Sequence, residues 1–467
     1  MEGNRLDPIN KLIEYALTLK YEDLPVEVVG TIKNRIRDTL GTAIAGSSTQ
    51  GCRKLNQIVR TWGGQQESTV MVYGYKVPAH MAALCNCTMA RGRELDDVHE
   101  VAGTHTSATI IPSAFAIAEY SKFRQARPVN GKEFISAIAL GSDILCRLRM
   151  AGREEGPEMG WLGETYAPIA VAAMGSRIMK FSQSTAIEAT GIAYAQCACN
   201  AQANADGAFT VSLQQGLGAQ AGIFSLVLAE GGLTGAKNIL QGRYGLYPLY
   251  LRGNFHPDIL TGELGRRFEI TNVTTKFYPC CQGCHAAISG VLEVAEEFRI
   301  ELEEIDHVTI YTNTFFSSIL GTPDKVHPRT SYDAQFSYFF TVAAALAKGA
   351  VKLDHFSEQV IRDADILRVA NKVRVVADPA KDALRSLIPP IDIEVVMKNG
   401  KQYSKTVEFV KGHPKNPANE ADYWNKFDEC TRFAAQEIST ENINEIKRLI
   451  NSLENLQDVA LIMDRVS

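Results

Sequence analysis

The sequence predicts a mainly α-helical protein: a large helical domain built from both chain ends, with a smaller α/β lid domain inserted between them. Three observations predict this class. Apolar residues recur at helical spacing over roughly the first 250 residues, β-branched runs start after residue 271, and helical patterning returns after Pro414. The expected domain segments are residues 1–270 (helical), 271–413 (α/β lid) and 414–467 (helical).

The helical part begins with clear start signals. Asp7 and Pro8 provide an N-cap and a first helical residue, and Asn130 and Glu133 form a capping-box-like pair before another helix. Two further stretches, 169–179 and 186–198, are rich in alanine and glycine. Small residues let helix backbones approach closely, which favours a compact bundle with buried central helices.

The insert shows a different pattern, in which short β-branched runs alternate with amphipathic segments. We expect strands over 308–312, 373–376, 391–397 and 402–410, and helices over 286–298 and 335–347. Asn399 and Gly400 between the last two strands predict a hairpin with a type I′ turn.

Composition excludes several classes of partner. There are 48 Lys plus Arg against 53 Asp plus Glu, so the net charge is -5 and provides no field for nucleic acid or for a membrane surface. The N-terminal residues have no apolar h-region, and the ten cysteines lie in apolar segments. We therefore expect a cytoplasmic protein with free thiols.

Two motifs resemble cofactor or metal sites but are better explained as parts of the packed core. Gly216–Ala221 matches a loose dinucleotide fingerprint without the acidic residue that should follow, so helix-packing glycines are expected. Cys280, Cys281, Cys284 and His285 resemble half of a zinc site, and no second pair stands nearby. We expect no cofactor and no metal.

One segment carries a strong candidate for acid–base chemistry. Glu94, Asp96, Asp97 and His105 lie between an apolar helix over 79–90 and a helix expected to open near Pro112. A carboxylate beside a histidine can orient the ring and make it a proton carrier near neutral pH. The alternative is a solvated acidic loop with capping aspartates.

A second candidate is Lys276, which lies among aromatic and cysteine residues where the α/β insert begins. A lysine in an apolar setting can hold a substrate carboxylate. The alternative is a surface lysine whose stem only covers apolar groups.

Together, the two segments resemble the MmgE/PrpD family, which includes 2-methylcitrate dehydratase, cis-aconitate decarboxylase and iminodisuccinate epimerase. The matching residues are Glu94-Leu95-Asp96-Asp97-Val98-His99 with His105 and Pro112, and Lys276-Phe277-Tyr278-Pro279-Cys280-Cys281 with His285-Ala286-Ala287. The resemblance covers essentially the whole chain. It implies a helical domain with an α/β lid, a homodimer and catalysis without a cofactor.

The chain departs from the family pattern at four positions. Val98 replaces a threonine and Thr106 a proline, while Leu162 and Val211 stand where the family has a histidine and a lysine. The scaffold and part of the proton chemistry are kept, but several substrate contacts are not.

We therefore expect a cofactor-independent, dehydratase-type lyase that abstracts the α-proton of a small di- or tricarboxylic acid. His105 would carry the proton, with Asp96 or Asp97 orienting it or acting as the partner acid or base. Lys276 would bind the carboxylate and stabilise the enolate-like charge as it develops. Further substrate-binding candidates are Arg93, Glu94 and His99. Alternatives are an isomerase or epimerase, a decarboxylase, or a catalytically inactive scaffold protein.

Overall fold

The computed structural model describes residues 6–152, 159–384 and 388–467, and these are mainly helical. They form two compact units. The first comprises Met1–Gly92, Asp96–Val273 and Asn419–Ser467, and the second comprises Arg93–Leu95 and Thr274–Ala418. The unit boundaries fall at 273/274 and 418/419, where the sequence pattern suggested 270/271 and 413/414. Three residues of the acidic segment also belong to the second unit.

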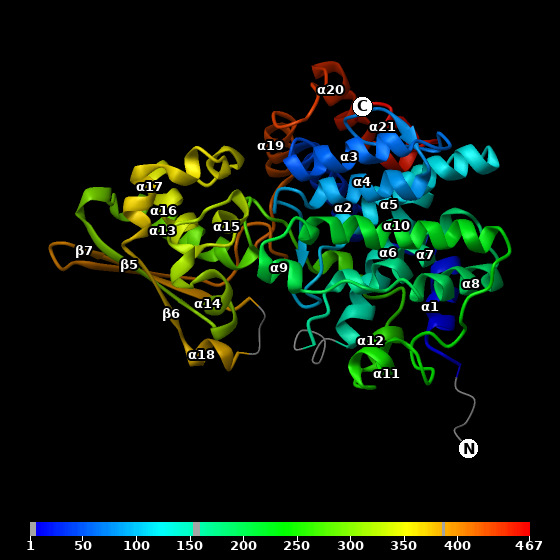
Figure 1. The fold of residues 1–467 in the computed structure, drawn as a ribbon, viewed down its shortest axis with the longest axis horizontal. Coiled ribbons are helices and arrows are strands. Elements are labelled where there is room, and N and C mark those ends of the chain that lie inside the picture. Colours follow the sequence, from blue (N-terminus) through cyan, green and yellow to red (C-terminus); the bar gives the residue numbers. More distant parts are fainter. Residues whose placement is uncertain (1–5, 153–158, 385–387) are drawn as a thin grey trace. The chain divides into compact units, whose positions relative to one another are not determined.

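The first unit is almost entirely helical (Figure 1). Its helices are α1 (Ile9–Thr18), α2 (Val26–Gly46), α3 (Gln50–Trp62), α4 (Ala79–Arg91), α5 (Thr106–Gln125), α6 (Gly131–Ala151), α7 (Ala167–Ile178), α8 (Gln183–Tyr194), α9 (Gln202–Asp206), α10 (Thr210–Glu230), α11 (Leu246–Leu251), α12 (Pro257–Thr261), α19 (Glu420–Thr431), α20 (Thr440–Asn451) and α21 (Ala460–Met463). Its short strands are β1 (Ser68–Thr69), β2 (Lys76–Val77) and β3 (Val98–His99).

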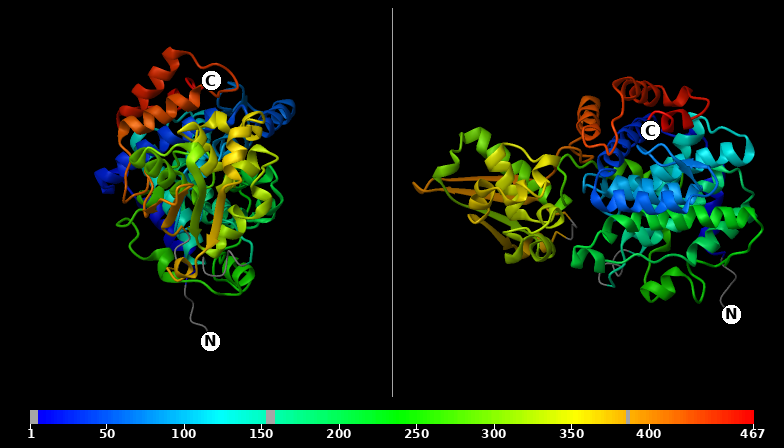
Figure 2. Two further views of the ribbon diagram at one scale, coloured as in Figure 1. Left: turned by 90° about the vertical axis from the view of Figure 1, so that its left-hand side faces the viewer. Right: turned by 45° about the horizontal axis from the view of Figure 1, so that its top comes forward.

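Small residues allow the central helices of this unit to pack closely. α10 lies against α4 and α7 (Figures 1 and 2). A Cβ atom at Gly216 would come within 2.3 Å of the Leu84 carbonyl oxygen on α4. The Gly216–Ala221 motif therefore lies inside a helix, and its interpretation as packing glycines is confirmed.

Helix ends follow the start signals in the sequence. The Asp7 carboxylate accepts the N–H of Ile9 at 3.0 Å, and the Asn130 side chain accepts the N–H of Glu133 at 2.9 Å. The C-terminal helices pack back on the N-terminal ones, α19 and α20 on α2, and α21 on α5. Both ends of the chain thus contribute to the first unit.

One helix start was predicted incorrectly. α5 begins at Thr106, and Pro112 lies inside it instead of opening it. The earlier start is stabilised because the Asp97 carboxylate accepts the N–H of Ser107 at 3.2 Å, in the first turn of the helix. This contact brings the acidic segment onto the N-terminus of α5.

The second unit is an α/β module. Its helices are α13 (Gln282–Phe298), α14 (Thr314–Leu320), α15 (Ser331–Gln335), α16 (Tyr338–Lys348), α17 (Ala364–Ala370) and α18 (Pro379–Asp382), and its strands are β5 (Ile305–Thr312), β6 (Val373–Ala377), β7 (Ile391–Met397) and β8 (Gln402–Val407), while β4 (Val273–Thr274) lies at the boundary. The strand order is β6-β5-β7-β8, with β5 and β6 parallel and the other pairs antiparallel. Alternate residues of β7 are buried, and α13 packs on β7 and β8.

The β7–β8 hairpin is confirmed, but its turn type was predicted incorrectly. A type I′ turn needs positive φ at both central residues, whereas only Gly400, at φ 84°, has it here. The N–H of Gly400 donates to the carbonyl oxygen of Met397 at 2.8 Å. The N–H of Met397 donates to the carbonyl oxygen of Lys401, also at 2.8 Å. This three-residue loop places its single left-handed residue at the glycine.

No helix in the described part of the chain is long and apolar enough to cross a bilayer.

Candidate active site

The acidic segment contains two aspartates that are almost fully buried. Asp96 is 2% exposed and Asp97 is 1% exposed. The alternative interpretation of this segment as a solvated loop is therefore wrong, although Asp97 does hold a backbone N–H of α5. Burying two carboxylates is costly unless cations and hydrogen-bond donors surround them.

His105 is positioned by both aspartates. Its Nδ1 atom lies 2.9 Å from Oδ2 of Asp96 and 3.0 Å from the backbone carbonyl oxygen of Asp97. Because a carbonyl oxygen can only accept, Nδ1 must carry a hydrogen, and Nε2 is left as the proton-accepting nitrogen of the neutral ring. The His105 side chain is 19% exposed, so it is the member of this cluster that solvent can reach.

Two arginines balance the aspartates. Arg91, the last residue of α4, places Nη1 3.3 Å from Oδ1 of Asp96, and Arg35 on α2 places Nη1 3.8 Å from Oδ2 of Asp97. Burial raises the pKa of the Asp97 carboxyl above its usual range, with Arg35 and Ser107 opposing that shift. The cluster therefore pairs a solvent-accessible imidazole with buried, charge-compensated carboxylates.

A second buried ion pair lies close to Asp97. Asp38 on α2 pairs with Lys426 on α19, and both side chains are nearly inaccessible to solvent. Burial raises the pKa of Asp38 to about 6, with Lys426 opposing the shift and Asp97 adding to it. Sequence inspection missed this pair because its members are almost 400 positions apart.

His99 is buried beside this cluster, and both its ring nitrogens have protein partners. Nδ1 accepts the N–H of Ala102 at 3.0 Å, so Nε2 carries the hydrogen toward Oε2 of Glu269 at 3.2 Å. Burial alone would raise the pKa of Glu269, but hydrogen bonds from His99 and Asn272 hold it at about 2. This is the environment of a structural residue, and substrate binding by His99 stays an untested prediction.

Lys276 belongs to the second unit and is 1% exposed, so the alternative of a surface lysine is wrong. Its Nζ lies 3.2 Å from Oε2 of Glu94 and 3.5 Å from the Glu94 carbonyl oxygen. Glu94 has φ 52°, a left-handed conformation that costs energy in a non-glycine residue. The backbone of the neighbouring Arg93 is fixed by a hydrogen bond, because its carbonyl oxygen accepts from Nε2 of Gln335 at 2.9 Å.

Of the cysteines that follow Lys276, Cys280 and Cys284 are buried and Cys281 is half-buried. Burial raises the pKa of Cys280 well above its usual value and that of Cys281 to about 12. The ring of His285 packs edge-on against Tyr278. In residues 6–152, 159–384 and 388–467, no cluster of three or more His, Cys, Asp or Glu could hold a metal ion.

The structure also reveals a series of buried side-chain hydrogen bonds that sequence inspection missed. Oε1 of buried Glu164 accepts Nε2 of Gln215 at 2.5 Å, and Oε1 of Gln215 accepts the hydroxyl of Thr109 on α5. Gly163, which precedes Glu164, packs closely on the loop before His105, since a Cβ atom at Gly163 would lie 2.5 Å from Cβ of Thr104. The hydrogen-bonded series therefore adjoins that loop. The available signal was a glutamate in an otherwise small and apolar stretch.

The two apolar replacements belong to segments that adjoin the acidic cluster. Leu162 immediately precedes Gly163, and Val211 is 5% exposed at the start of α10. The hydroxyl of Ser212, next to Val211, lies 3.5 Å from the carbonyl oxygen of Arg91. Neither replacement can donate a hydrogen bond to an anion.

The described residues form a helical unit and an α/β unit, and the helical unit holds the partly exposed His105 against buried carboxylates. The signature of the MmgE/PrpD N-terminal domain matches residues 10–258, and that of the MmgE/PrpD C-terminal domain matches residues 278–452. The chain belongs to the MmgE/PrpD family, as its motifs indicated.

Several relatives are similar over almost their full length. A cis-aconitate decarboxylase-like protein of Aspergillus oryzae is 24% identical over 98% of this chain and 96% of its own. Cis-aconitate decarboxylase of Aspergillus terreus is 24% identical over 97% of this chain and 94% of its own, and that of Homo sapiens is 24% identical over 95% and 91%. These similarities support an enzyme of dehydratase or decarboxylase type.

Proposed function

We propose that the protein is a cofactor-independent lyase that abstracts a proton from the carbon next to a carboxylate in a small di- or tricarboxylic acid. The observation that carries this proposal is the orientation of His105. Its Nδ1–H donates to the Asp97 carbonyl oxygen, with the Asp96 carboxylate 2.9 Å from the same nitrogen, so Nε2 is the proton-accepting atom. A general base needs that fixed tautomer and access to the substrate.

In the dehydratase reaction, Nε2 of His105 takes the α-proton and the C–H electron pair forms a carbon–carbon double bond. The bond to the β-hydroxyl breaks, and that oxygen leaves as water after receiving a proton from the imidazolium. Asp96 and Asp97 stabilise the imidazolium while it exists, because its Nδ1 side faces both residues.

Lys276 is proposed to bind a substrate carboxylate and to stabilise the negative charge that builds on it. Glu94 neutralises the buried ammonium when no substrate is present. Arg93 remains a candidate for a second carboxylate. We leave His99 out of the proposal because both its nitrogens already have partners.

A decarboxylase is the second candidate, favoured by the relatives, all of which are named for cis-aconitate decarboxylase. In this reaction the bond to a carboxylate breaks, carbon dioxide leaves, and the electron pair stays on the substrate. Protonated His105 then donates its Nε2 proton to that carbon. An epimerase would share the first step of the dehydratase, and the carbanion would then take a proton from water or a second acid on the opposite face, while His105 releases its proton to solvent.

One experiment separates these reactions. The purified protein is incubated in deuterated water with a panel of dicarboxylates and tricarboxylates, and the products are followed by NMR. Water loss identifies a dehydratase, and carbon dioxide release identifies a decarboxylase. Deuterium incorporation with inversion at the α-carbon, and without loss of water or carbon dioxide, identifies an epimerase. Folded protein that leaves every compound unchanged would overturn the proposal.

A further inference from the structure

A cavity of about 350 Å³ lies in the first unit between α3 and the turn that joins β1 to β2. Two arginines, Arg53 and Arg60, contribute to its wall, and Ala435 and Gln436 close one side. None of the described residues that line it is an aspartate or glutamate. An anion entering it would meet positive charge without a competing carboxylate on the wall.

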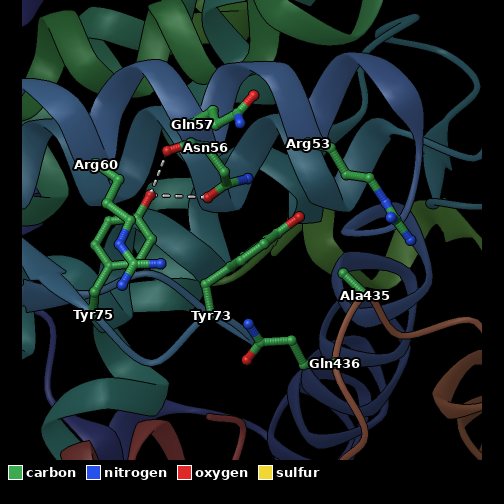
Figure 3. Close-up of a pocket in the computed structure, with 8 residues that line it drawn as sticks. All are labelled: Arg53, Asn56, Gln57, Arg60, Tyr73, Tyr75, Ala435 and Gln436. Atoms are coloured by element: carbon green, nitrogen blue, oxygen red, sulfur yellow. Dashed lines mark hydrogen bonds between the residues drawn. The ribbon is translucent and has the colours of Figure 1, made fainter.

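The two arginines come from one face of α3. They are seven residues apart, so their Cα atoms are separated by about 10 Å along the helix axis. Nε of Arg53 donates to the carbonyl of Ser48 at 3.0 Å, which anchors its guanidinium at one end of the cavity. The Arg60 guanidinium lies over the Tyr75 ring at the other end, 5.6 Å from its centroid (Figure 3).

Aromatic rings lie between the two cations. Tyr73 and Tyr75 make an edge-to-face contact at 6.4 Å, and both hydroxyls are tethered. The Tyr73 hydroxyl donates to the carbonyl of Ser47 at 2.8 Å, and that of Tyr75 donates to the carbonyl of Asn56 at 3.0 Å. Figure 3 shows the Tyr73 ring between Arg60 and Arg53, so a ligand that reaches both cations passes this ring.

The turn that carries Tyr73 is strained. Val72 has φ 70°, a left-handed conformation that is a genuine outlier for a β-branched residue. The surroundings hold it in place, since Val72 is 2% exposed and its N–H donates to the carbonyl of Val466 at 2.8 Å. Strain of this kind costs about 1–3 kcal/mol and is concentrated at ligand-binding and functional sites.

We infer that this cavity binds a nucleoside phosphate, with its phosphate on the arginine at one end, its base against the Tyr73 ring, and the second arginine beside the polar edge of the base. Arginine pairs with phosphate through charge-assisted, often bidentate hydrogen bonds, and tyrosine provides a flat face for stacking. The side chain of Gln436 also lines the cavity, and its amide can both donate to and accept from the edge of a base. The volume is near the lower limit for ligand sites, which fits a mononucleotide.

Isothermal titration calorimetry of the full chain with AMP and ADP tests the inference. Wild type should bind with one-to-one stoichiometry, and Arg53→Ala and Arg60→Ala should each weaken binding about tenfold or more, because each removes a charged hydrogen-bond donor from the ligand. Lys54→Ala is the matched control: it removes a positive charge from the same helix, and Lys54 is not part of the cavity wall. It should keep wild-type affinity.

Absence of binding by wild type, or an equal loss in Lys54→Ala and Arg60→Ala, would overturn the inference. Inorganic phosphate or tripolyphosphate binding as tightly as ADP would also overturn it, by showing attraction to charge alone.

A second measurement needs only wild type. Photolabelling with 8-azido-AMP should mark residues 50–62, 73–75 or 435–436, and labelling confined to other peptides would contradict the assignment.

Discussion

Nδ1 of His105 lies 2.9 Å from Oδ2 of Asp96, and the backbone carbonyl of the next residue, Asp97, accepts from the same nitrogen at 3.0 Å. The ring therefore has a fixed tautomer and a fixed orientation before any substrate binds. Since Asp96 and Asp97 are buried and His105 is partly exposed, the proposed proton exchange with a ligand would pass through the histidine.

Replacing His105 by asparagine should abolish α-proton exchange and turnover. A general acid or base contributes about 10²–10⁴-fold, so a residual rate near 1% or below is expected. His307→Asn is a close control, because the His307 side chain is also 19% exposed and also contacts a carboxylate, Asp306, at 2.7 Å. Turnover close to wild type in His105→Asn would remove the acid–base role.

Replacing Lys276 by methionine should reduce stability as well as activity, because Glu94 would remain as a buried carboxylate without its cation. Breaking such a pair costs about 3–5 kcal/mol. The double variant Glu94→Gln, Lys276→Met should recover much of the free energy of unfolding and still lack activity. Denaturant unfolding and kinetics of the three variants test this, and an active double variant would show that Lys276 is only structural.

Stability should depend on pH through Asp38. Burial raises the pKa of Asp38 from 3.8 to about 6, so between these values the folded state binds a proton that the unfolded state has lost. The free energy of unfolding therefore falls as pH rises through this window, by up to about 3 kcal/mol. Lys426 is the facing cation, and Asp97 and Arg35 are nearby charges.

The variant Asp38→Asn removes this titration. Its free energy of unfolding should be compared with wild type by urea denaturation at pH 4, 5, 6 and 7. The penalty of the substitution should shrink as pH rises, because wild type alone loses stability across that range. A penalty that grows with pH would mean that the folded state lowers the pKa of Asp38.

Activity should survive exhaustive dialysis against EDTA. This prediction follows from the proposed mechanism, in which His105, oriented by Asp96 beside Arg91, carries the proton. Loss of turnover that zinc restores would show that the run of Cys280, Cys281, Cys284 and His285 had been misinterpreted.

A four-carbon dicarboxylate should be a better substrate than a tricarboxylate. Val211 is buried beside Ser212, which contacts Arg91, and Leu162 precedes the glycine that packs on Thr104. A third carboxylate facing these apolar side chains would lose several kcal/mol of solvation with no cation in return. Turnover rates on cis-aconitate, 2-methylcitrate and four-carbon diacids test this, and a clear preference for a tricarboxylate would refute it.

Much of the local structure could be predicted because it depends on neighbours in the chain. The caps at Asp7 and Asn130, the paired strands β7 and β8, and the packing glycines of α10 follow from residues within a few positions of one another. The acidic segment with His105 was also found this way, since its members lie within a dozen residues. Residue type and spacing therefore determined the helical character and the candidate for proton transfer.

Only the tertiary structure decided which of these polar groups are buried and with what partner. Glu94 and Lys276 are 182 positions apart, and His99 and Glu269 are 170 apart, so no local pattern indicates that they pair. The start of α5 before Pro112 depends on a contact from Asp97, and the cavity at Tyr73 depends on a strained turn held by Val466. Burial and charge compensation are properties of the whole packed unit: they arise when segments distant in the chain exclude water from one another, which the order of residues does not reveal.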